Sequence, residues 1–242
     1  MSQSVWTRQQ AVHPHRGPFP ISFAHRGGAG PARENSIPAF QAALQAGARG
    51  LESDTWLTAD GIAVLDHDGS VEGTAIGLIK RADLPEHIPS IDELYDECGT
   101  DYDLSLDVID TRAVTPVIDA ARARGAVDRL WVVAPWGSVR AWRSIDPDVH
   151  IISNVPVARI GPGFAAGLKA IRAAGVCGIN LPYTWWNPLW VWRVHNAGLL
   201  AFGWHAHKPW QISYLHRIGC DGIYSDTVSA LVRAHETRAL GR

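Results

Sequence analysis

The chain has 242 residues, a length that suits one large α/β domain and is too long for a small disulfide-stabilised protein. Hydrophobic residues make up 46% of the chain and charged residues 19%, so the sequence can bury a core and is not of a disordered type. The 22 basic and 24 acidic residues give a formal net charge of −2, which argues against binding to a nucleic-acid backbone.

The cysteines and the hydrophobic runs indicate the cellular compartment. The three cysteines, Cys98, Cys177 and Cys220, are scattered without metal-ligand spacing, which is typical of free thiols in a reducing compartment. The N-terminal residues lack the apolar segment of a secretory signal, and no apolar run reaches the roughly 18 residues that a membrane span needs. We therefore expect a cytoplasmic protein without a transmembrane segment.

The first half of the chain alternates strand and helix patterns after a lead-in over residues 1–20. A short insertion, 69–87, follows the second strand and its antiparallel excursion. Ser36 and Ser90 are the expected helix N-caps, and Glu93 completes a capping box with Ser90. The expected strands are 21–25, 50–57, 62–68 and 104–109, and the expected helices are 36–48, 90–98 and 111–124.

The second half repeats the same alternation. Once the excursion at 62–68 is set aside, eight strands alternate with helices, and such βα units form a parallel sheet. Eight units in this length favour a single (β/α)8 TIM barrel over residues 1–242, with an open doubly wound sheet as the alternative. The expected strands here are 129–134, 150–154, 177–181, 200–205 and 221–225, and the expected helices are 164–174, 189–196, 211–218 and 228–240.

Acidic side chains gather at the carboxyl ends of the early strands, where a barrel places its active site. Glu52 and Asp54 are two residues apart on one strand, so their side chains share a face. Two carboxylates side by side repel each other unless a cation lies between them, and Asp107 on the neighbouring strand would be a third oxygen ligand. This set suits Mg²⁺ or Ca²⁺. The alternative is an ordinary salt-bridge network with arginines.

Histidines follow two of these apolar strands. His25 and His67 flank the carboxylates and fit a general acid and a general base, although a single histidine in such a place is often a core residue. Arg26 could clamp an anionic substrate, because a guanidinium group pairs well with phosphate.

Together these residues resemble the glycerophosphodiester phosphodiesterase family. The resemblance implies a TIM barrel that hydrolyses phosphodiesters with bound Ca²⁺ or Mg²⁺. It also implies Glu52, Asp54 and Asp107 as metal ligands, His25 and His67 as the acid–base pair, and Arg26 as a phosphate contact. The nucleophile would be a hydroxyl of the substrate, with water attacking later. The matching motifs are His25-Arg26-Gly27, Glu34-Asn35-Ser36, Glu52-Ser53-Asp54 and His67-Asp68, followed by 88–94, 104–108 and 219–226.

The sequence departs from the family pattern at three places. Ile109 stands where the family has a lysine, and such a lost contact to phosphate typically costs on the order of 2 kcal/mol. His205 follows a late strand and faces either the substrate or the solvent. Trp185 and Trp204 come from a tryptophan-rich stretch that either lines an apolar pocket or covers the interface between helices and barrel. We expect Trp185, Trp204 and His205 to contact the substrate.

Three functions follow from this pattern. The first is a metal-dependent phosphoric diester hydrolase that acts on a glycerophosphodiester or a lipid-like phosphodiester. The second is a metal-dependent lyase or cyclase of specialised metabolism that acts on a hydrophobic phosphate or a prenyl diphosphate, which would suit Ile109 and the tryptophans. The third is a non-catalytic barrel that binds an anion. The presence of both His25 and His67 argues against this third function.

Overall fold

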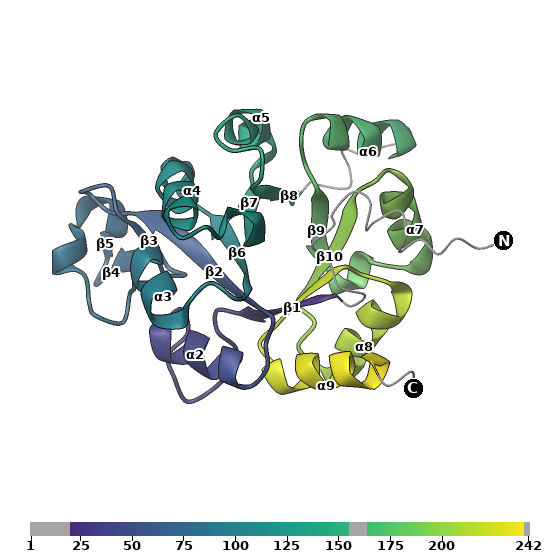
Figure 1. Ribbon diagram of the computed structural model, residues 1–242, viewed down its shortest axis with the longest axis horizontal. Helices are drawn as coiled ribbons and strands as arrows, with labels where there is room; N and C mark the ends of the chain where they lie inside the picture. The colour runs from purple at the N-terminus through teal and green to yellow at the C-terminus, as the bar shows by residue number, and fades with distance from the viewer. Residues whose placement is uncertain (1–19, 155–163, 240–242) are drawn as a thin grey trace.

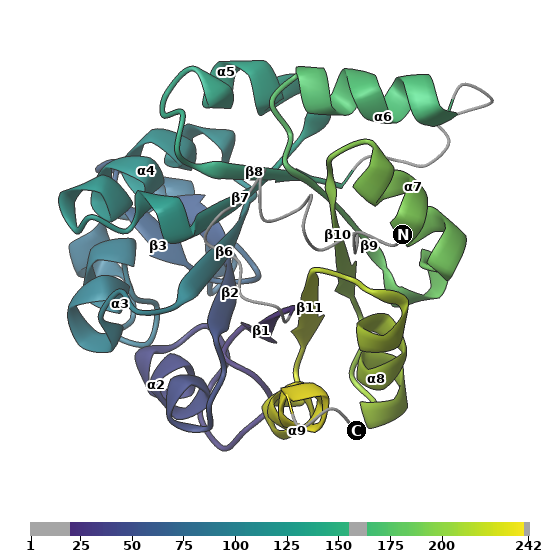
Figure 2. The same cartoon turned by 45° about the vertical axis from the view of Figure 1, so that its right-hand side comes forward.

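A closed ring of eight parallel strands forms the centre of the protein in this computed structural model, which describes residues 20–154 and 164–239. The first strand pairs in parallel with both the second and the last, so the sheet closes into a barrel (Figures 1 and 2). This confirms the TIM barrel and excludes the open sheet. The lead-in at 1–19 lies outside the described residues. The ring strands are β1 (Ile21–His25), β2 (Gly50–Leu57), β6 (Asp103–Val108), β7 (Leu130–Ala134), β8 (His150–Ser153), β9 (Gly178–Pro182), β10 (Leu200–Trp204) and β11 (Gly222–Ser225).

Helices surround the ring on its outer side (Figure 2). None of the described helices has the length and apolarity to cross a membrane. The sequence patterns do not predict α5, and they extend the last helix to residue 240, which lies outside the described part. The helices are α2 (Ile37–Gln45), α3 (Ile91–Cys98), α4 (Val114–Ala123), α5 (Val139–Arg143), α6 (Phe164–Ala173), α7 (Pro188–Asn196), α8 (Pro209–Ile218) and α9 (Val228–Ala239).

The two serine caps differ from each other. Ser90 Oγ accepts a hydrogen bond from the Glu93 amide, and the Glu93 carboxylate accepts one from the Ser90 amide, so the capping box of α3 is confirmed. Ser36 occupies the N-cap position of α2 but makes no capping bond, because its hydroxyl donates to the Arg33 carbonyl instead.

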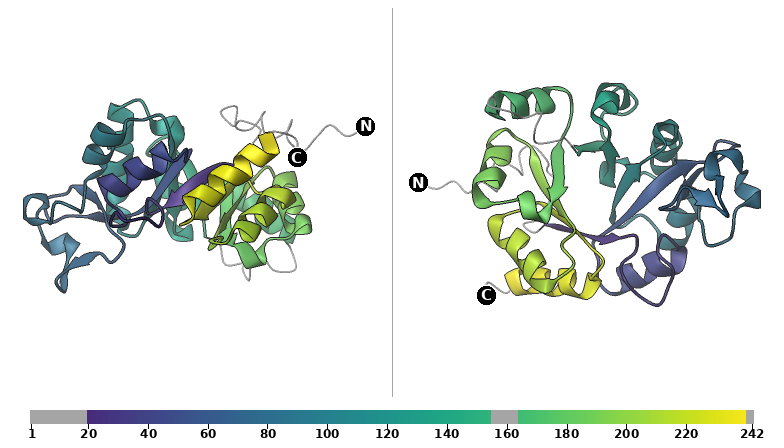
Figure 3. Two further views of the ribbon diagram at one scale, coloured as in Figure 1. Left: turned by 90° about the horizontal axis from the view of Figure 1, so that it is seen from below. Right: turned by 180° about the vertical axis from the view of Figure 1, so that it is seen from behind.

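The segment between β2 and α3 extends outward from one edge of the barrel (Figure 3). Strand β3 (Ala63–Leu65) pairs antiparallel with β2, and β4 (Ser70–Val71) pairs with β5 (Thr74–Ala75). The strand expected at 62–68 is therefore shorter in the structure, where it covers only Ala63–Leu65. His67 and Asp68 belong to the loop that follows β3.

Aromatic rings fill the barrel interior. Phe23 stacks on Tyr224 with ring centroids 4.7 Å apart, and Phe202 lies 6.4 Å from Phe23. Glycines on neighbouring strands make room for them, since a Cβ on Gly222 would lie 2.3 Å from Phe202 and one on Gly178 would lie 2.4 Å from it. Because strand side chains alternate, the residues two positions beyond these rings also point inward, at the carboxyl end of the barrel.

Candidate active site

A cavity of about 220 Å³ opens at the carboxyl ends of the barrel strands. Its wall is built mainly from inward-facing positions of the strands, as the alternation of side chains requires. Tyr224 forms part of it, and its buried hydroxyl shares a 3.0 Å hydrogen bond with Ser105. The lining residues are His25, Arg26, Glu52, Asp54, Ser105, Asp107, Val133, Asn154, Asn180, Trp204, His205 and Tyr224.

The three carboxyl groups expected to act together all line this cavity. The pKa of Glu52 is raised to about 8, chiefly by burial; the Asp54 charge contributes to the rise, and His25 opposes it. Burial and the Asp54 charge raise the pKa of Asp107 to about 6, and burial also raises the pKa of Asp54. Burial and mutual repulsion thus disfavour three negative charges in this cavity.

Arg26 partly balances these acids. Its backbone amide donates to Glu52 Oε2 at 3.1 Å, and its Nε lies 3.5 Å from Asp54 Oδ2. The Arg26 backbone has φ 53°, a left-handed conformation that arginine rarely adopts, and this bend turns the side chain over the cavity. Asp54 Oδ2 is nevertheless buried without a hydrogen bond.

The residues fit a hard divalent cation by their chemistry. Three carboxylates in one cavity, one of them with an unsatisfied buried oxygen, are the donor set that Mg²⁺ or Ca²⁺ takes. In the described part of the chain, however, no group of three or more His, Cys, Asp or Glu side chains is placed to hold a metal ion as it stands. Glu52, Asp54 and Asp107 would therefore have to adjust around an ion.

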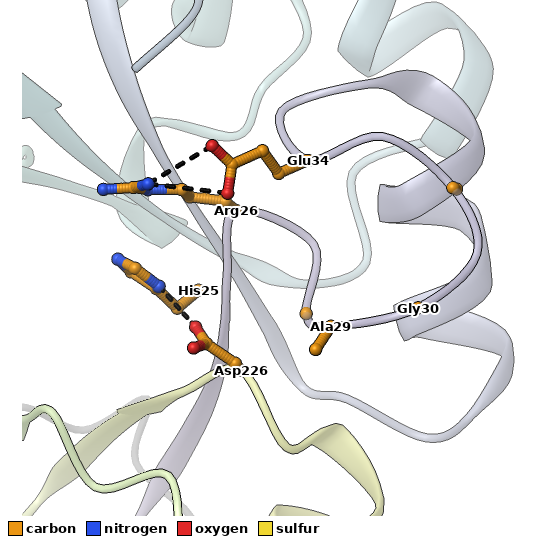
Figure 4. Close-up of a pocket in the computed structure, with 8 residues that line it drawn as sticks. His25, Arg26, Ala29, Gly30, Glu34 and Asp226 are labelled. Atoms are coloured by element: carbon orange, nitrogen blue, oxygen red, sulfur yellow. Dashed lines mark hydrogen bonds and ion pairs between the residues drawn. The ribbon is translucent and has the colours of Figure 1, made fainter. Parts of the chain in front are cut away.

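His25 is held from two sides. Its Nδ1 lies 2.6 Å from Asp226 Oδ1 (Figure 4). Its Nε2 lies 3.8 Å from Glu52 Oε2. Burial lowers the pKa of His25, but the bond to Asp226 and the charge of Glu52 outweigh it, so the pKa is raised overall. The bond to Asp226 fixes the orientation of the ring and leaves Nε2 toward the cavity.

His67 occupies a more exposed place. Its Nδ1 lies 2.8 Å from Asp68 Oδ1, and its side chain does not line the cavity described above. Its electrostatic interaction with Asp54 nonetheless opposes the rise in the pKa of that carboxyl group, so the histidine lies near the acidic cluster. The structure therefore brings His25 into the cavity and His67 to its surroundings.

A second cavity, of about 290 Å³, lies on the other side of His25 and Arg26. Arg26 Nη1 donates to Glu34 Oε1 at 3.3 Å, and this pair and the His25–Asp226 pair stand on two sides of the space (Figure 4). Small residues of the loop after β1 complete it. The lining residues are His25, Arg26, Gly28, Ala29, Gly30, Ala32, Glu34 and Asp226.

The three expected substrate contacts separate in the structure. Trp204 and His205 line the first cavity, and His205 has φ 58°, again a left-handed backbone. Burial and the neighbouring His207 lower the pKa of His205. Trp185 is 54% exposed and lines neither cavity. Ile109, which replaces the family lysine, is 45% exposed and also lies outside both linings.

The structure adds residues to which the sequence assigns no role. Asp226 pairs with His25 and, through Oδ2, with His207 Nδ1 at 3.1 Å. Asn154 and Asn180 line the first cavity, and Asn180 Oδ1 is buried without a hydrogen bond. The available signal was positional, since Asn154 and Asp226 directly follow strands and Asn180 shares the inward face of β9.

Comparisons with known proteins show which family the chain resembles. Residues 25–86 match the Glycerophosphoryl diester phosphodiesterase family model. A segment of 63 residues is 46% identical to Glycerophosphodiester phosphodiesterase 1 of Bos taurus and 44% identical to that of Homo sapiens, which corresponds to 26% of this chain and 19% of each relative. The chain thus spans about a fifth of the length of the mammalian relatives that it matches.

Solved structures resemble the whole barrel. An Oleispira antarctica phosphodiesterase, solved with the product sn-glycerol-3-phosphate, is similar with a TM-score of 0.77 and 19% identity, over 90% of this chain and 97% of that one. A glycerophosphodiester phosphodiesterase of Thermotoga maritima is similar with a TM-score of 0.73 and 18% identity, over 90% and 99%. The chain thus carries the sequence pattern of the glycerophosphoryl diester phosphodiesterase family over residues 25–86 and shares the barrel fold of its solved members.

Proposed function

We propose that this protein is a metal-dependent phosphoric diester hydrolase that cleaves a glycerophosphodiester or a lipid-like phosphodiester. The observation that carries the proposal is the single cavity in which Glu52, Asp54 and Asp107 meet His25 and Arg26. An acidic cluster beside a half-buried histidine and a guanidinium group suits a phosphate ester that arrives with a cation.

Glu52, Asp54 and Asp107 would hold Mg²⁺ or Ca²⁺. Bound there, the ion would neutralise phosphoryl oxygens and orient the diester. The unsatisfied Asp54 Oδ2 and the raised pKa of Glu52 support this assignment, because a cation would compensate both. Arg26 would contact a further phosphoryl oxygen, and the fact that it lines both cavities supports this role.

His25 and His67 would share the proton transfers. His25 Nε2 points toward the cavity while Asp226 holds Nδ1, so His25 can exchange a proton with a substrate oxygen at Nε2. His67, the more exposed histidine, would exchange a proton with the substrate oxygen that lies nearer the solvent. The attacking group would be a neighbouring hydroxyl of the substrate or, in a later step, water.

The lining of the cavity bears on the substrate. Of the described aromatic side chains in the tryptophan-rich stretch, Trp204 lines the cavity, whereas Trp185 is exposed and Trp186 is buried in the core. A single tryptophan of this stretch thus lines the cavity, which favours a phosphodiester over a prenyl diphosphate, whose long chain needs a broader apolar wall. The three cysteines, scattered along the chain without metal-ligand spacing, support a reducing, cytoplasmic location.

Removal of the metal tests the proposal. After exhaustive EDTA treatment, hydrolysis of glycerophosphocholine should cease and return on addition of Mg²⁺ or Ca²⁺. Glu52→Gln should lower turnover by roughly a hundredfold or more, because it removes a ligand charge. The exposed Glu86, changed to Gln, is the matched control and should leave turnover unchanged. Full activity after EDTA, or in Glu52→Gln, would falsify the proposal.

A further inference from the structure

Four large apolar side chains are exposed on one sector of the barrel. Trp185 is 54% exposed, Leu189 52%, Trp192 54% and Trp210 60%. Soluble proteins rarely place several tryptophans in water within one region, and such patches mark a site of interaction. We call these four residues the aromatic sector.

The aromatic sector is carried by neighbouring elements. Trp185 ends the 3-10 turn Tyr183–Trp185, which leads into α7, and Trp210 lies in the first turn of α8. The Tyr183 and Trp210 rings are 6.0 Å apart in an edge-to-face contact, and α7 and α8 are neighbours around the ring (Figure 2). Leu189 and Trp192 are three residues apart on α7, so they share one helix face.

The sector stands on a rigid base. Trp186, next to Trp185, is 2% exposed, and its indole Nε1 donates to the Phe202 carbonyl at 2.8 Å. Tyr214 of α8 donates its hydroxyl to the Trp186 carbonyl at 2.9 Å. One tryptophan of the pair therefore anchors the segment in the core while its neighbour projects outward, so the exposed rings are held in place for contact with a partner.

The part of the chain that carries the aromatic sector contains basic but no acidic residues. No Asp or Glu occurs between Asp148 and Asp221, a stretch that includes α6, α7 and α8, although the whole chain has 24 acidic residues. Lys208 is exposed two residues before Trp210. The other exposed basic residues described in this stretch are Lys169, Arg172, Arg193 and Arg217. Lys208 and Arg193 lie nearest the exposed tryptophans in sequence. With no acidic residue on α6, α7 or α8, this side of the barrel is complementary to an anionic, partly apolar surface.

The sector also borders the catalytic cavity. Trp185 and Trp210 follow β9 and β10 at the carboxyl ends of these strands, and Asn180 and Trp204 of the same two strands line the cavity. A surface bound by the sector would therefore lie beside the mouth of the cavity.

We propose that the aromatic sector docks the protein on an anionic phospholipid surface, with the tryptophan rings in the headgroup region and the mouth of the cavity next to the lipid. Tryptophan suits this boundary because its ring is apolar and its N–H is polar. The docking also narrows the substrate class to phosphodiesters presented at a lipid–water interface. This part of the inference rests on the proposed function.

Binding to vesicles tests the docking. The full chain is sedimented with vesicles of phosphatidylcholine, with and without phosphatidylglycerol. Wild-type protein should bind the vesicles that contain phosphatidylglycerol, and less so at high salt. The double variant Trp192→Ala/Trp210→Ala should lower the vesicle partition coefficient by roughly tenfold or more. Both side chains are more than half exposed, so their removal should leave the thermal unfolding midpoint unchanged.

Leu78→Ala is the matched control. Leu78 is 77% exposed but lies in the insertion after β2, so its removal should leave vesicle binding unchanged. The inference is overturned if wild-type protein binds neither vesicle, or if Leu78→Ala weakens binding as much as the double variant. It is also overturned if the sector instead mediates self-association, seen as a dimer in sedimentation velocity that the double variant abolishes, without vesicle binding.

Enzyme assays separate this inference from the proposed function. The double variant should hydrolyse water-soluble glycerophosphocholine as wild type does, but should lose most activity on a lysophospholipid embedded in the vesicles. If no phosphodiester is hydrolysed under any metal while binding still depends on Trp192 and Trp210, the proposed function fails and the docking stands.

Discussion

At the residue scale, Asp226 distinguishes His25 from His67. Asp226 holds Nδ1 of a half-buried ring inside the cavity, and its hydrogen bond raises the pKa of His25 against the opposing effect of burial. Asp226→Asn keeps the size of the side chain but removes the charge. We expect the pKa of His25 to fall and turnover to drop by roughly a hundredfold. Steady-state kinetics against pH, with an NMR titration of the His25 ring, measures both effects.

Asp68→Asn is the comparison within the same protein. Asp68 makes a similar bond to His67, but the Asp68 side chain is 76% exposed and solvent screens its charge. Its replacement should therefore lower turnover much less than Asp226→Asn does. If the two variants are equally impaired, or if Asp226→Asn leaves the pKa of His25 unchanged, Asp226 does not orient the ring for catalysis.

The residues of the site differ in how well the sequence predicts them. His25, Glu52, Asp54 and Asp107 follow from the alternation of side chains along strands that are close in sequence, and the structure places all four in one cavity. Asp226 lies 201 residues from His25, and only closure of the barrel makes them neighbours. The sequence pattern therefore predicts the residues that the early strands contribute to the site. The position of Asp226 beside His25 follows only from the pairing of the first strand with the last.

At the element scale, the loop after β1 joins the two ends of the barrel. The Ala29 amide donates to the Asp226 carbonyl at 2.7 Å, and Gly28 has φ 82°. A Cβ on Gly28 would lie 2.4 Å from Val228 Cγ2 and 3.2 Å from the Asp226 carbonyl oxygen. Gly28→Ala should therefore lower the free energy of unfolding by about 1–3 kcal/mol, and activity with it, because the loop must move away from Asp226.

Gly30→Ala is the matched control in the same loop. A Cβ on Gly30 would have no neighbouring atom within 4 Å, and the Gly30 backbone has no positive φ. Its replacement should therefore change the free energy of unfolding by less than about 0.5 kcal/mol. Urea denaturation of both variants measures the difference. Equal destabilisation would show that the close contact between the loop and the segment after β11 does not matter.

Elements with local signals are predicted well. The capping box fixes the start of α3, and β1 and β2 have the expected bounds. Helix α5 is missed because it has only five residues and follows a 3-10 turn that contains Gly137, so its periodicity is too short to detect. Tertiary packing of Val139 and Trp142 against the barrel stabilises it instead.

At the scale of the whole molecule, closure of the barrel has an electrostatic consequence. The paired strands β2 and β6 carry Glu52, Asp54 and Asp107, and the closed barrel buries these side chains, so their pKa values rise. A carboxyl group with a raised pKa binds more protons in the folded state than in the unfolded state. Its contribution to stability therefore falls as pH rises from its ordinary pKa to its folded one. His25, whose pKa is also raised, has the same sign.

The metal-free protein should consequently lose stability between about pH 4 and pH 8, through Asp107 first and Glu52 last. Mg²⁺ or Ca²⁺ must displace protons from these carboxyl groups, so the rise in Tm on adding metal should be larger at pH 8 than at pH 5. Differential scanning calorimetry at both pH values measures this. In Glu52→Gln the pH-dependent part of the rise should shrink, because the group with the highest pKa is gone. A metal-induced rise that is equal at both pH values, or that persists in Glu52→Gln, would show that the ion binds elsewhere.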